Sequence, residues 1–347
     1  MRATIVLLGG LLLAVALPAQ QLSGPVNPRA KKTFAGAEQW VQHGYYQSAI
    51  DSFRKADKQD GGHCELCAAR IVENGLKIDD FKSADAAAQQ LVADAKSPQF
   101  AAFAHMERGS VQFREALVKN KQECFADADR EFQASIAAYP AYPDAHFYDG
   151  MALAHLRQDA AAKAQFEIFL KTAPPSDVDR ARAQRFIDDP ALARARMAPP
   201  FSITTLRGRQ VSLDGLTGKV VLIDFWATWC GPCREALPNI QEIARKFSGQ
   251  PLVILSVSLD SDDAAWRKFV AKHDMTWLQY RDGYWNGPLA HLFGVTEIPH
   301  TFTIDADGVL ADEHIGDANI EKRLKKLCAQ ADQMRESPQV AQRAAAD

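Results

Sequence analysis

One stretch limits the possible folds of this chain more than any other: a strongly apolar run that ends at two closely spaced cysteines. Residues 220–226 read Val-Val-Leu-Ile-Asp-Phe-Trp, and Cys230 and Cys233 follow directly. A short apolar run predicts a buried strand, and the periodicity of residues 234–247 predicts a helix after it. The sequence therefore predicts a strand that delivers a dithiol to the N-terminus of a helix.

Two thiols at this spacing are suited to thiol–disulfide exchange. One thiolate attacks a disulfide, and the second thiol resolves the mixed disulfide that forms. At a helix start, free backbone N–H groups and the partial positive charge of the helix end stabilise a thiolate. We therefore expect Cys230 to be the nucleophile, and Cys233, about one turn further into the helix, to be the resolving thiol.

Asp224 is the one charged residue within the apolar run. In a strand buried on both faces, a lone carboxylate is costly unless it is protonated, hydrogen-bonded or used in chemistry. Desolvation should raise its pKa, which would suit it to accept a proton near neutral pH. The alternative is an edge position in which the carboxylate is in water.

Residues 225–233, Phe-Trp-Ala-Thr-Trp-Cys-Gly-Pro-Cys, resemble the thioredoxin superfamily, and the resemblance covers roughly residues 197–334. It implies an α/β thioredoxin fold without a cofactor or metal, and it matches Asp224 to the buried acid of that family. Ile298 and Pro299 match the cis-proline loop, which would face the cysteines. His300 departs from the commoner Thr and either tunes the thiolate or points to solvent. The substrate-binding residues that the resemblance implies are Trp229, Gly231, Pro232, Ile298 and Pro299.

The opening residues 198–201, the run at 218–222 and an added helix and strand within 262–280 resemble the TlpA/ResA branch of exported thioredoxin-like proteins. The Gly231-Pro232 dipeptide is similar to that of reducing thioredoxins, whose potential is about −270 mV. The implied activity is reduction of protein disulfides, with a membrane thiol carrier of the cytochrome c maturation type as electron donor. A non-catalytic envelope scaffold and a thiol peroxidase are the alternatives, and the peroxidase motif lacks its proline.

Residues 34–196 are Ala-rich and helical, with small and large side chains at recurring positions. Two examples are Ala49-x-x-x-Phe53-x-x-Ala56 and Ala128-x-x-x-Phe132-x-x-Ser135. A third copy of the pattern spans residues 143–174. This pattern resembles tetratricopeptide repeats, whose helix pairs stack into a solenoid with a concave surface that commonly binds peptides or proteins. An ordinary helical bundle is the alternative. The fold class expected is therefore an α-helical repeat domain followed by an α/β thioredoxin-fold domain.

A second Cys-x-x-Cys pair, Cys64 and Cys67, begins a helical stretch in this first domain. Ala68 stands where a c-type haem would need His, and a zinc site would need further ligands beyond His63. We expect a structural disulfide, with a second redox relay and a metal site as alternatives. The pairing of Cys124 and Cys328 stays open.

Forty basic and 43 acidic side chains give a net charge of −3, so no basic field exists to bind nucleic acid. Residues 1–19 have the build of a secretory signal, which predicts a periplasmic or secreted protein, or a membrane-tethered one if the signal stays uncleaved. We expect a linker at 20–33, a helical domain at 34–196, a thioredoxin-like domain at 197–334 and a disordered tail at 335–347.

Overall fold

The computed structural model describes residues 22–316 and 320–336 and divides the chain into two compact units at residues 194 and 195. The signal peptide predicted at residues 1–19, and the part of the predicted tail from residue 337 onward, lie outside the described residues. We call residues 22–194 the repeat domain and residues 195–336 the α/β domain, and we describe each by itself.

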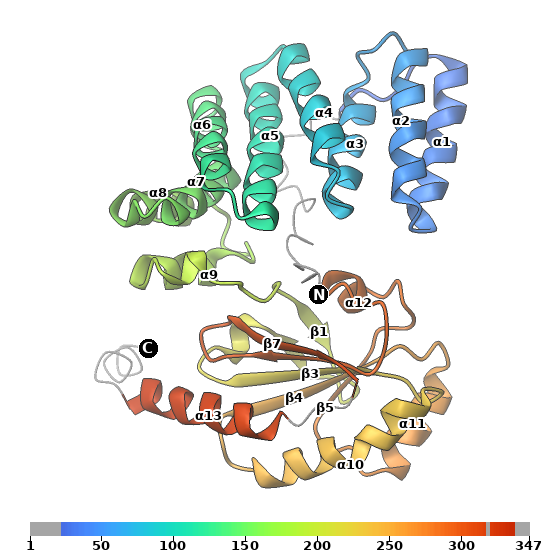
Figure 1. Cartoon of the computed structure of the whole chain (residues 1–347), viewed down its shortest axis with the longest axis vertical. Coiled ribbons are helices and arrows are strands. Elements are labelled where there is room, and N and C mark those ends of the chain that lie inside the picture. The colour runs from blue at the N-terminus through green and yellow to red at the C-terminus, as the bar shows by residue number, and fades with distance from the viewer. Residues whose placement is uncertain (1–21, 317–319, 337–347) are drawn as a thin grey trace. The chain divides into compact units, whose positions relative to one another are not determined.

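The repeat domain consists of helices in which each packs against the next along the chain (Figure 1). They are α1 (Pro28–Gln42), α2 (Tyr46–Gln59), α3 (Glu65–Lys77), α4 (Phe81–Asp94), α5 (Pro98–Lys119), α6 (Gln122–Ala138), α7 (Pro143–His155), α8 (Asp159–Thr172) and α9 (Arg180–Asp188), with a short 3₁₀ turn at Leu192–Arg194.

Glycines allow the helix pairs of this domain to approach closely. A Cβ atom on Gly109 of α5 would lie 2.5 Å from the ring of Phe132 of α6, and one on Gly150 of α7 would lie 2.7 Å from Phe166 of α8. Both phenylalanines are fully buried and are 34 residues apart in sequence. The same contact between a glycine and an aromatic ring therefore recurs in successive pairs, and the domain is an α-helical repeat as predicted.

The linker predicted at residues 20–33 is wrong for residues 28–33, because α1 begins at Pro28. Proline is favoured in the first helical turn, and the Asn27 side chain accepts a hydrogen bond from the N–H of Arg29 as an N-cap. The segment before the helix is also held: the N–H groups of Val26 and Asn27 donate to Asp60 Oδ1 at 2.8 and 2.7 Å. The linker was expected from the polar composition and from Pro25 and Pro28, and a proline fits a helix start as well as a linker.

The α/β domain is built on a five-stranded sheet of order β5-β4-β3-β6-β7, with β3 at its centre (Figure 1). β3 is parallel to β4 and antiparallel to β6. The elements are β1 (Ser202–Thr204), β2 (Gln210–Ser212), β3 (Val220–Trp226), α10 (Gly231–Lys246), β4 (Leu252–Ser258), α11 (Asp263–Lys272), β5 (Leu278–Arg281), α12 (Pro288–Leu292), β6 (His300–Ile304), β7 (Leu310–Ile315) and α13 (Glu321–Glu336), with a 3₁₀ turn at Asp214–Leu216.

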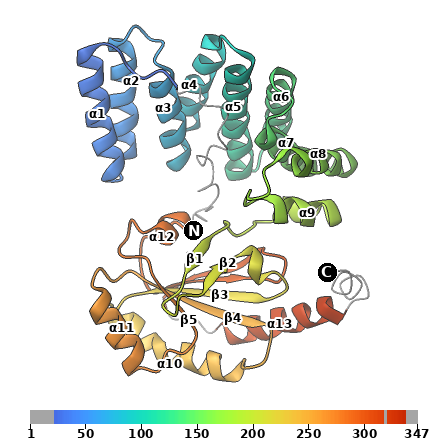
Figure 2. The same cartoon turned by 180° about the vertical axis from the view of Figure 1, so that it is seen from behind.

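Successive side chains of β3 point to opposite faces of the sheet, and this alternation decides which of them face α10. Val220 and Leu222 pack with residues of α10 and α13, whereas Val221, Ile223 and Phe225 belong to the core on the other face of the sheet. Figure 2 shows α10 and α13 together on one side of this sheet. Because successive side chains of a strand point to opposite faces, Asp224 shares the α10 side with Leu222.

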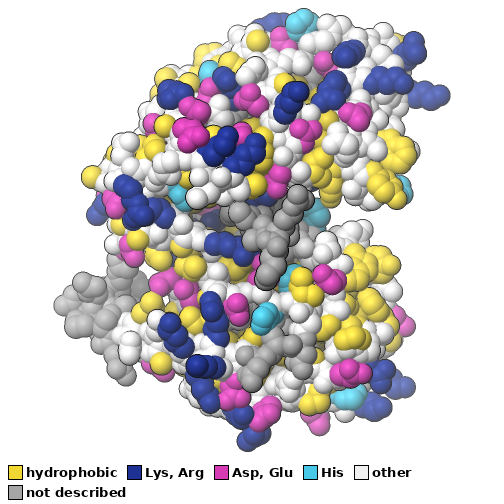
Figure 3. Space-filling view, viewed as in Figure 1, with side chains coloured by type: hydrophobic (Ala, Val, Ile, Leu, Met, Phe, Trp, Pro, Cys, Tyr) yellow, Lys and Arg dark blue, Asp and Glu magenta, His cyan; other side chains and the backbone are white. Residues whose placement is uncertain are grey.

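Acidic and basic side chains are interspersed on the visible face (Figure 3). Among the described residues, no helix is both long enough and apolar enough to cross a membrane.

Candidate active site

Cys230 and Cys233 lie where β3 gives way to α10 and form a disulfide. Cys230 is the N-cap of the helix, and its Sγ accepts a hydrogen bond from the N–H of Cys233 at 3.2 Å. Pro232 occupies the first turn, which suits a residue without an N–H. The same N–H and the helix end would stabilise a thiolate at Cys230 after reduction.

The loop before β6 brings a backbone carbonyl to the dithiol. The peptide bond between Ile298 and Pro299 is cis, and the carbonyl oxygen of Ile298 lies 3.8 Å from Cys230 Sγ. The structure therefore places Ile298 beside the first cysteine, and Pro299 follows it through the cis peptide bond.

Asp224 is 7% exposed and lies in the central strand, so the alternative of an edge position in water is wrong. Its burial raises the pKa of the carboxyl to about 6, and a hydrogen bond from Ser256 Oγ to Oδ2, 3.1 Å long, opposes that rise. No hydrogen bond joins the carboxyl directly to a cysteine among the described contacts.

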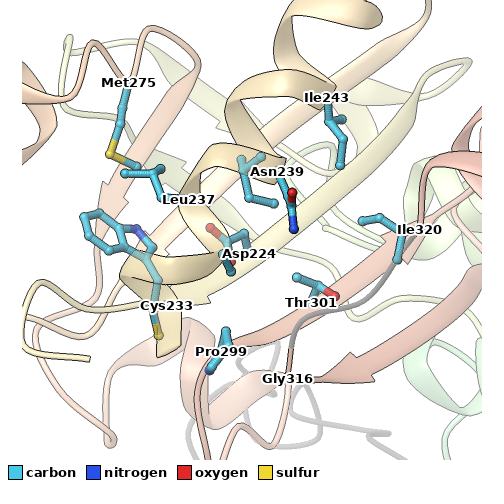
Figure 4. A pocket seen from close by; sticks show the side chains of 13 residues that line it. Asp224, Cys233, Leu237, Asn239, Ile243, Met275, Pro299, Thr301, Gly316 and Ile320 are labelled. Atoms are coloured by element: carbon cyan, nitrogen blue, oxygen red, sulfur yellow. The ribbon is translucent and has the colours of Figure 1, made fainter. Parts of the chain in front are cut away.

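A cavity of about 30 Å³ connects the acid with the resolving cysteine (Figure 4). Its walls include Asp224 from β3, Cys233 from α10, and Pro299 and Thr301 from the loop and strand opposite. A water molecule needs roughly 10–15 Å³ of such space. The cavity is therefore large enough for water to bridge the carboxyl and the thiol.

Exposed side chains surround the outer end of the dithiol. Trp229 is 55% exposed and its ring centroid lies 6.3 Å from that of Trp285. Gly231 and Pro232 are exposed, and a Cβ on Gly231 would meet nothing within 4 Å. Trp229, Gly231 and Pro232 are thus at the surface beside Cys230, whereas Ile298 is half-buried and Pro299 is buried.

His300 does not point to solvent, and that alternative is wrong. It is 3% exposed and stacks on Phe302, with ring centroids 4.4 Å apart. Its Nε2 lies 3.3 Å from Glu313 Oε1, and Glu313 also pairs with Arg196 at 2.8 Å. Because Thr301 lines the cavity, the alternation of β6 places His300 on the opposite face of the sheet from Asp224.

Asp260 is a site residue that the sequence interpretation missed. Its carboxylate accepts hydrogen bonds from the N–H and the hydroxyl of Thr228, at 3.0 and 2.6 Å, and from Ser258 Oγ at 2.7 Å. It thereby fixes the loop that leads into Cys230. The available signal was its position directly after β4, since parallel strands β3 and β4 end at the same edge of the sheet.

In the repeat domain, Cys64 and Cys67 also form a disulfide at a helix N-terminus. Both are almost fully buried, at 1% and 0% exposed, and Asp57 Oδ1 accepts a hydrogen bond from the N–H of Cys64. Cys124 and Cys328 are free thiols. Within residues 22–316 and 320–336, no group of three or more potential metal ligands gathers.

Comparison with known proteins places this site in a family. A family model described as AhpC/TSA matches residues 195–313. The thiol-disulfide oxidoreductase ResA of Bacillus cereus is 32% identical over 133 residues, which is 38% of this chain and 76% of the relative. The ResA of Bacillus thuringiensis subsp. konkukian is 30% identical over 145 residues, 41% of this chain and 83% of the relative. This chain belongs to the ResA family of thiol-disulfide oxidoreductases.

Two further known proteins are similar to this chain. The thiol:disulfide interchange protein DsbE of Pseudomonas fluorescens is 36% identical over 134 residues, 37% of this chain and 72% of the relative. A solved thiol-disulfide oxidoreductase from Bacteroides fragilis is 24% identical and covers 38% of this chain and 98% of its own, with a TM-score of 0.36. As a ResA-family member, the chain is a thiol-disulfide oxidoreductase.

Proposed function

We propose that this oxidoreductase reduces protein disulfides outside the cytoplasm, with Cys230 as nucleophile, Cys233 as resolving thiol and Asp224 as proton acceptor. The observation that carries the proposal is the division of the site into two sides. Cys230 lies beside the Ile298 carbonyl, whereas Cys233 and Asp224 line one cavity. Attack and resolution can therefore proceed on separate sides of the dithiol.

The reaction starts from the reduced enzyme. The Cys230 thiolate attacks one sulfur of a substrate disulfide, a mixed disulfide forms, and the other substrate sulfur leaves as a thiolate. Cys233 then transfers its proton to the Asp224 carboxylate, and its thiolate attacks the Cys230 sulfur. The second substrate sulfur leaves, both substrate thiolates end protonated, and two electrons have passed from enzyme to substrate.

The rim supports a protein substrate more than a small disulfide. The carbonyl of Ile298 offers an acceptor to the backbone N–H of an extended segment, as in other recognition through backbone hydrogen bonds. Trp229, Gly231 and Pro232, which flank Cys230 in the sequence, add exposed surface. Together with Pro299, these residues are the substrate-binding set of the proposal.

The repeat domain recruits a peptide or protein partner in this proposal. Stacked helix pairs form an extended surface that suits polypeptide binding better than chemistry. The predicted export signal, and a buried disulfide between Cys64 and Cys67 that is structural in this proposal, fit an oxidising compartment. Re-reduction would come from a membrane thiol carrier of the kind that serves cytochrome c maturation.

Reduction of insulin disulfides by a thiol reductant tests the proposal. We expect the wild type to accelerate the reaction and Cys230→Ser to lose that acceleration, because no nucleophile remains. Cys124→Ser, which changes a free thiol in α6, is the matched control and should keep the wild-type rate. A Cys230→Ser variant that still reduces insulin would contradict the proposal, and so would a wild type that reduces peroxide but not insulin.

A further inference from the structure

A hydrogen-bond chain reaches Asp224 from outside the dithiol motif. The indole Nε1–H of Trp277 donates to Ser256 Oγ at 2.8 Å, and Ser256 Oγ donates to Asp224 Oδ2 at 3.1 Å. Ser256 is fully buried and is the direct partner of Asp224 across β3 and β4. The chain thus runs from the residue before β5, through β4, to the central strand.

The chemistry of these groups fixes which of them donates and which accepts in each hydrogen bond. An indole N–H can only donate a hydrogen bond, so the Ser256 oxygen is its acceptor. The Ser256 hydroxyl has a single proton, and Asp224 Oδ2 is the acceptor found for it. A donated hydrogen bond also polarises the hydroxyl that receives it, which strengthens the bond to a charged carboxylate.

Among the groups around Asp224, the hydrogen bonds from Trp277 through Ser256 are the main polar influence on its carboxyl. Of the described residues that line the cavity, Cys233 on α10 is the only other titratable one. β6 contributes the neutral Thr301, α10 also contributes the neutral Asn239, and the α13 side contributes Ile320. Burial favours the protonated carboxyl, and the hydrogen bond from Ser256 favours the charged one.

We propose that Trp277 and Ser256 are positioning residues of the dithiol reaction, which orient the Asp224 carboxyl, stabilise its charged form and so control proton transfer between Cys233 and Asp224. The inference rests on the proposed role of Asp224 as proton acceptor. The segment between α11 and β5 would then contribute to the active site, because it supplies Trp277. Gln241 of α10 helps to hold that segment by donating to the carbonyl of His273 at 2.9 Å.

The test uses the full-length oxidised protein, in which neither cysteine of the active site titrates. The carboxyl ¹³C shift of Asp224, followed against pH, reports its protonation without any assay of activity. Ser256→Ala removes the donor, so we expect the titration midpoint to move upward by about one to two pH units. Trp277→Phe keeps a ring but removes the N–H, so we expect a smaller upward shift.

The chain offers a matched control for the tryptophan change. Trp266 of α11 is buried, and its Nε1 has no hydrogen-bond partner among the described residues. Trp266→Phe should therefore leave the Asp224 midpoint unchanged, although it alters a buried ring in the same way. Ser256→Thr retains the hydroxyl and should restore the wild-type midpoint.

Single-turnover kinetics of the reduced protein supply the second readout. The pH at which resolution by Cys233 reaches half its maximal rate should move upward with the NMR midpoint, while the first attack by Cys230 stays at the wild-type rate. Midpoints of Ser256→Ala and Trp277→Phe that match the wild type would overturn the inference. If the midpoints move but neither these variants nor Asp224→Asn alters resolution, the proposed role of Asp224 fails and the inference fails with it. Should Ser256→Ala not fold, Trp277→Phe alone decides, because a purely structural role would lower its melting temperature without moving the midpoint.

Discussion

Thr228 is bound twice by Asp260: its backbone N–H and its hydroxyl both donate to the Asp260 carboxylate, the hydroxyl at 2.6 Å. Trp226 and Ser258 are paired at the ends of β3 and β4, and Thr228 and Asp260 each come two residues later. The loop that carries Cys230 is therefore held by Asp260, which follows the neighbouring strand, as well as by its own helix. The position of the nucleophile depends on this long-range contact.

Asp260→Asn should weaken that tie, because an amide has one acceptor oxygen, and its NH₂ group would face the N–H of Thr228 and one of the two hydroxyls that now donate to the carboxylate. We expect the free energy of unfolding to fall by about 1–3 kcal/mol and the exchange rate to fall roughly tenfold. Urea denaturation and insulin reduction measure the two effects. Asp274→Asn is the control, since Asp274 is exposed and its φ of 48° suits asparagine. Wild-type stability and rate in Asp260→Asn would show that the contact does not matter.

Asp224 predicts a pH dependence of both rate and stability. Its folded-state pKa of about 6 lies above the value of about 3.9 in an unfolded chain, so its contribution to stability is present at low pH and is lost as pH rises through about 6. Asp224→Asn cannot ionise, so its stability relative to wild type should grow by on the order of 2–3 kcal/mol between about pH 4 and pH 8. Denaturation curves at both pH values measure this change.

The same residue should govern resolution of the mixed disulfide. In the wild type we expect the resolution rate to rise with pH through about 6, as the carboxylate becomes able to accept a proton. Asp224→Asn should slow resolution and flatten this profile while it spares the first attack. A steep wild-type profile retained in Asp224→Asn would assign the titration to another group.

Glu107 in the repeat domain should give a pH dependence of stability in the same direction, unrelated to disulfide exchange. It is 7% exposed on α5, and burial, together with the nearby charge of Glu73, raises its pKa to about 8. Stability that it contributes at low pH is lost as pH rises toward 8. Glu107→Gln should therefore gain on the order of 3 kcal/mol relative to wild type between about pH 5 and pH 9. Glu167→Gln, a change at an exposed position on α8, should show no such trend.

The Cys64–Cys67 disulfide should serve stability and not catalysis. Replacing both cysteines by alanine opens a very short loop, and we expect a loss of about 2 kcal/mol in unfolding free energy with insulin reduction unchanged. Cys124→Ser again controls for a lost sulfur. Activity lost by the double variant in a folded protein would instead make this pair a second redox site.

Local sequence signals were sufficient for the parts of the site that lie close together in the chain. The strand, the dithiol, the helix start and the buried acid fall within residues 220–247. The cis loop at Ile298 and Pro299 was expected from the resemblance to thioredoxins. Recurring small and large side chains likewise predicted the helical repeats, and the apolar run predicted the central strand.

The features that could not be predicted from the sequence depend on pairing between distant segments. Asp260 and Trp277 become meaningful only when β4 and β5 lie beside β3, and no local pattern shows which strand is the neighbour. His300 is buried because β7 brings Glu313 across from Phe302. The start of α1 was missed for a different reason, since Pro28 fits a helix start as well as a linker.

Trapping of the mixed disulfide tests the division of labour between the two cysteines most directly. A disulfide-containing peptide is mixed with the reduced Cys233→Ser variant, and the adduct is located by mass spectrometry of proteolytic fragments. We predict one stable adduct, attached to Cys230, and no adduct with Cys230→Ser under the same conditions. An adduct of Cys233→Ser on Cys64 or Cys67 in place of Cys230, an adduct of Cys230→Ser on Cys233, or equal trapping by both variants would contradict the assignment of Cys230 as the nucleophile.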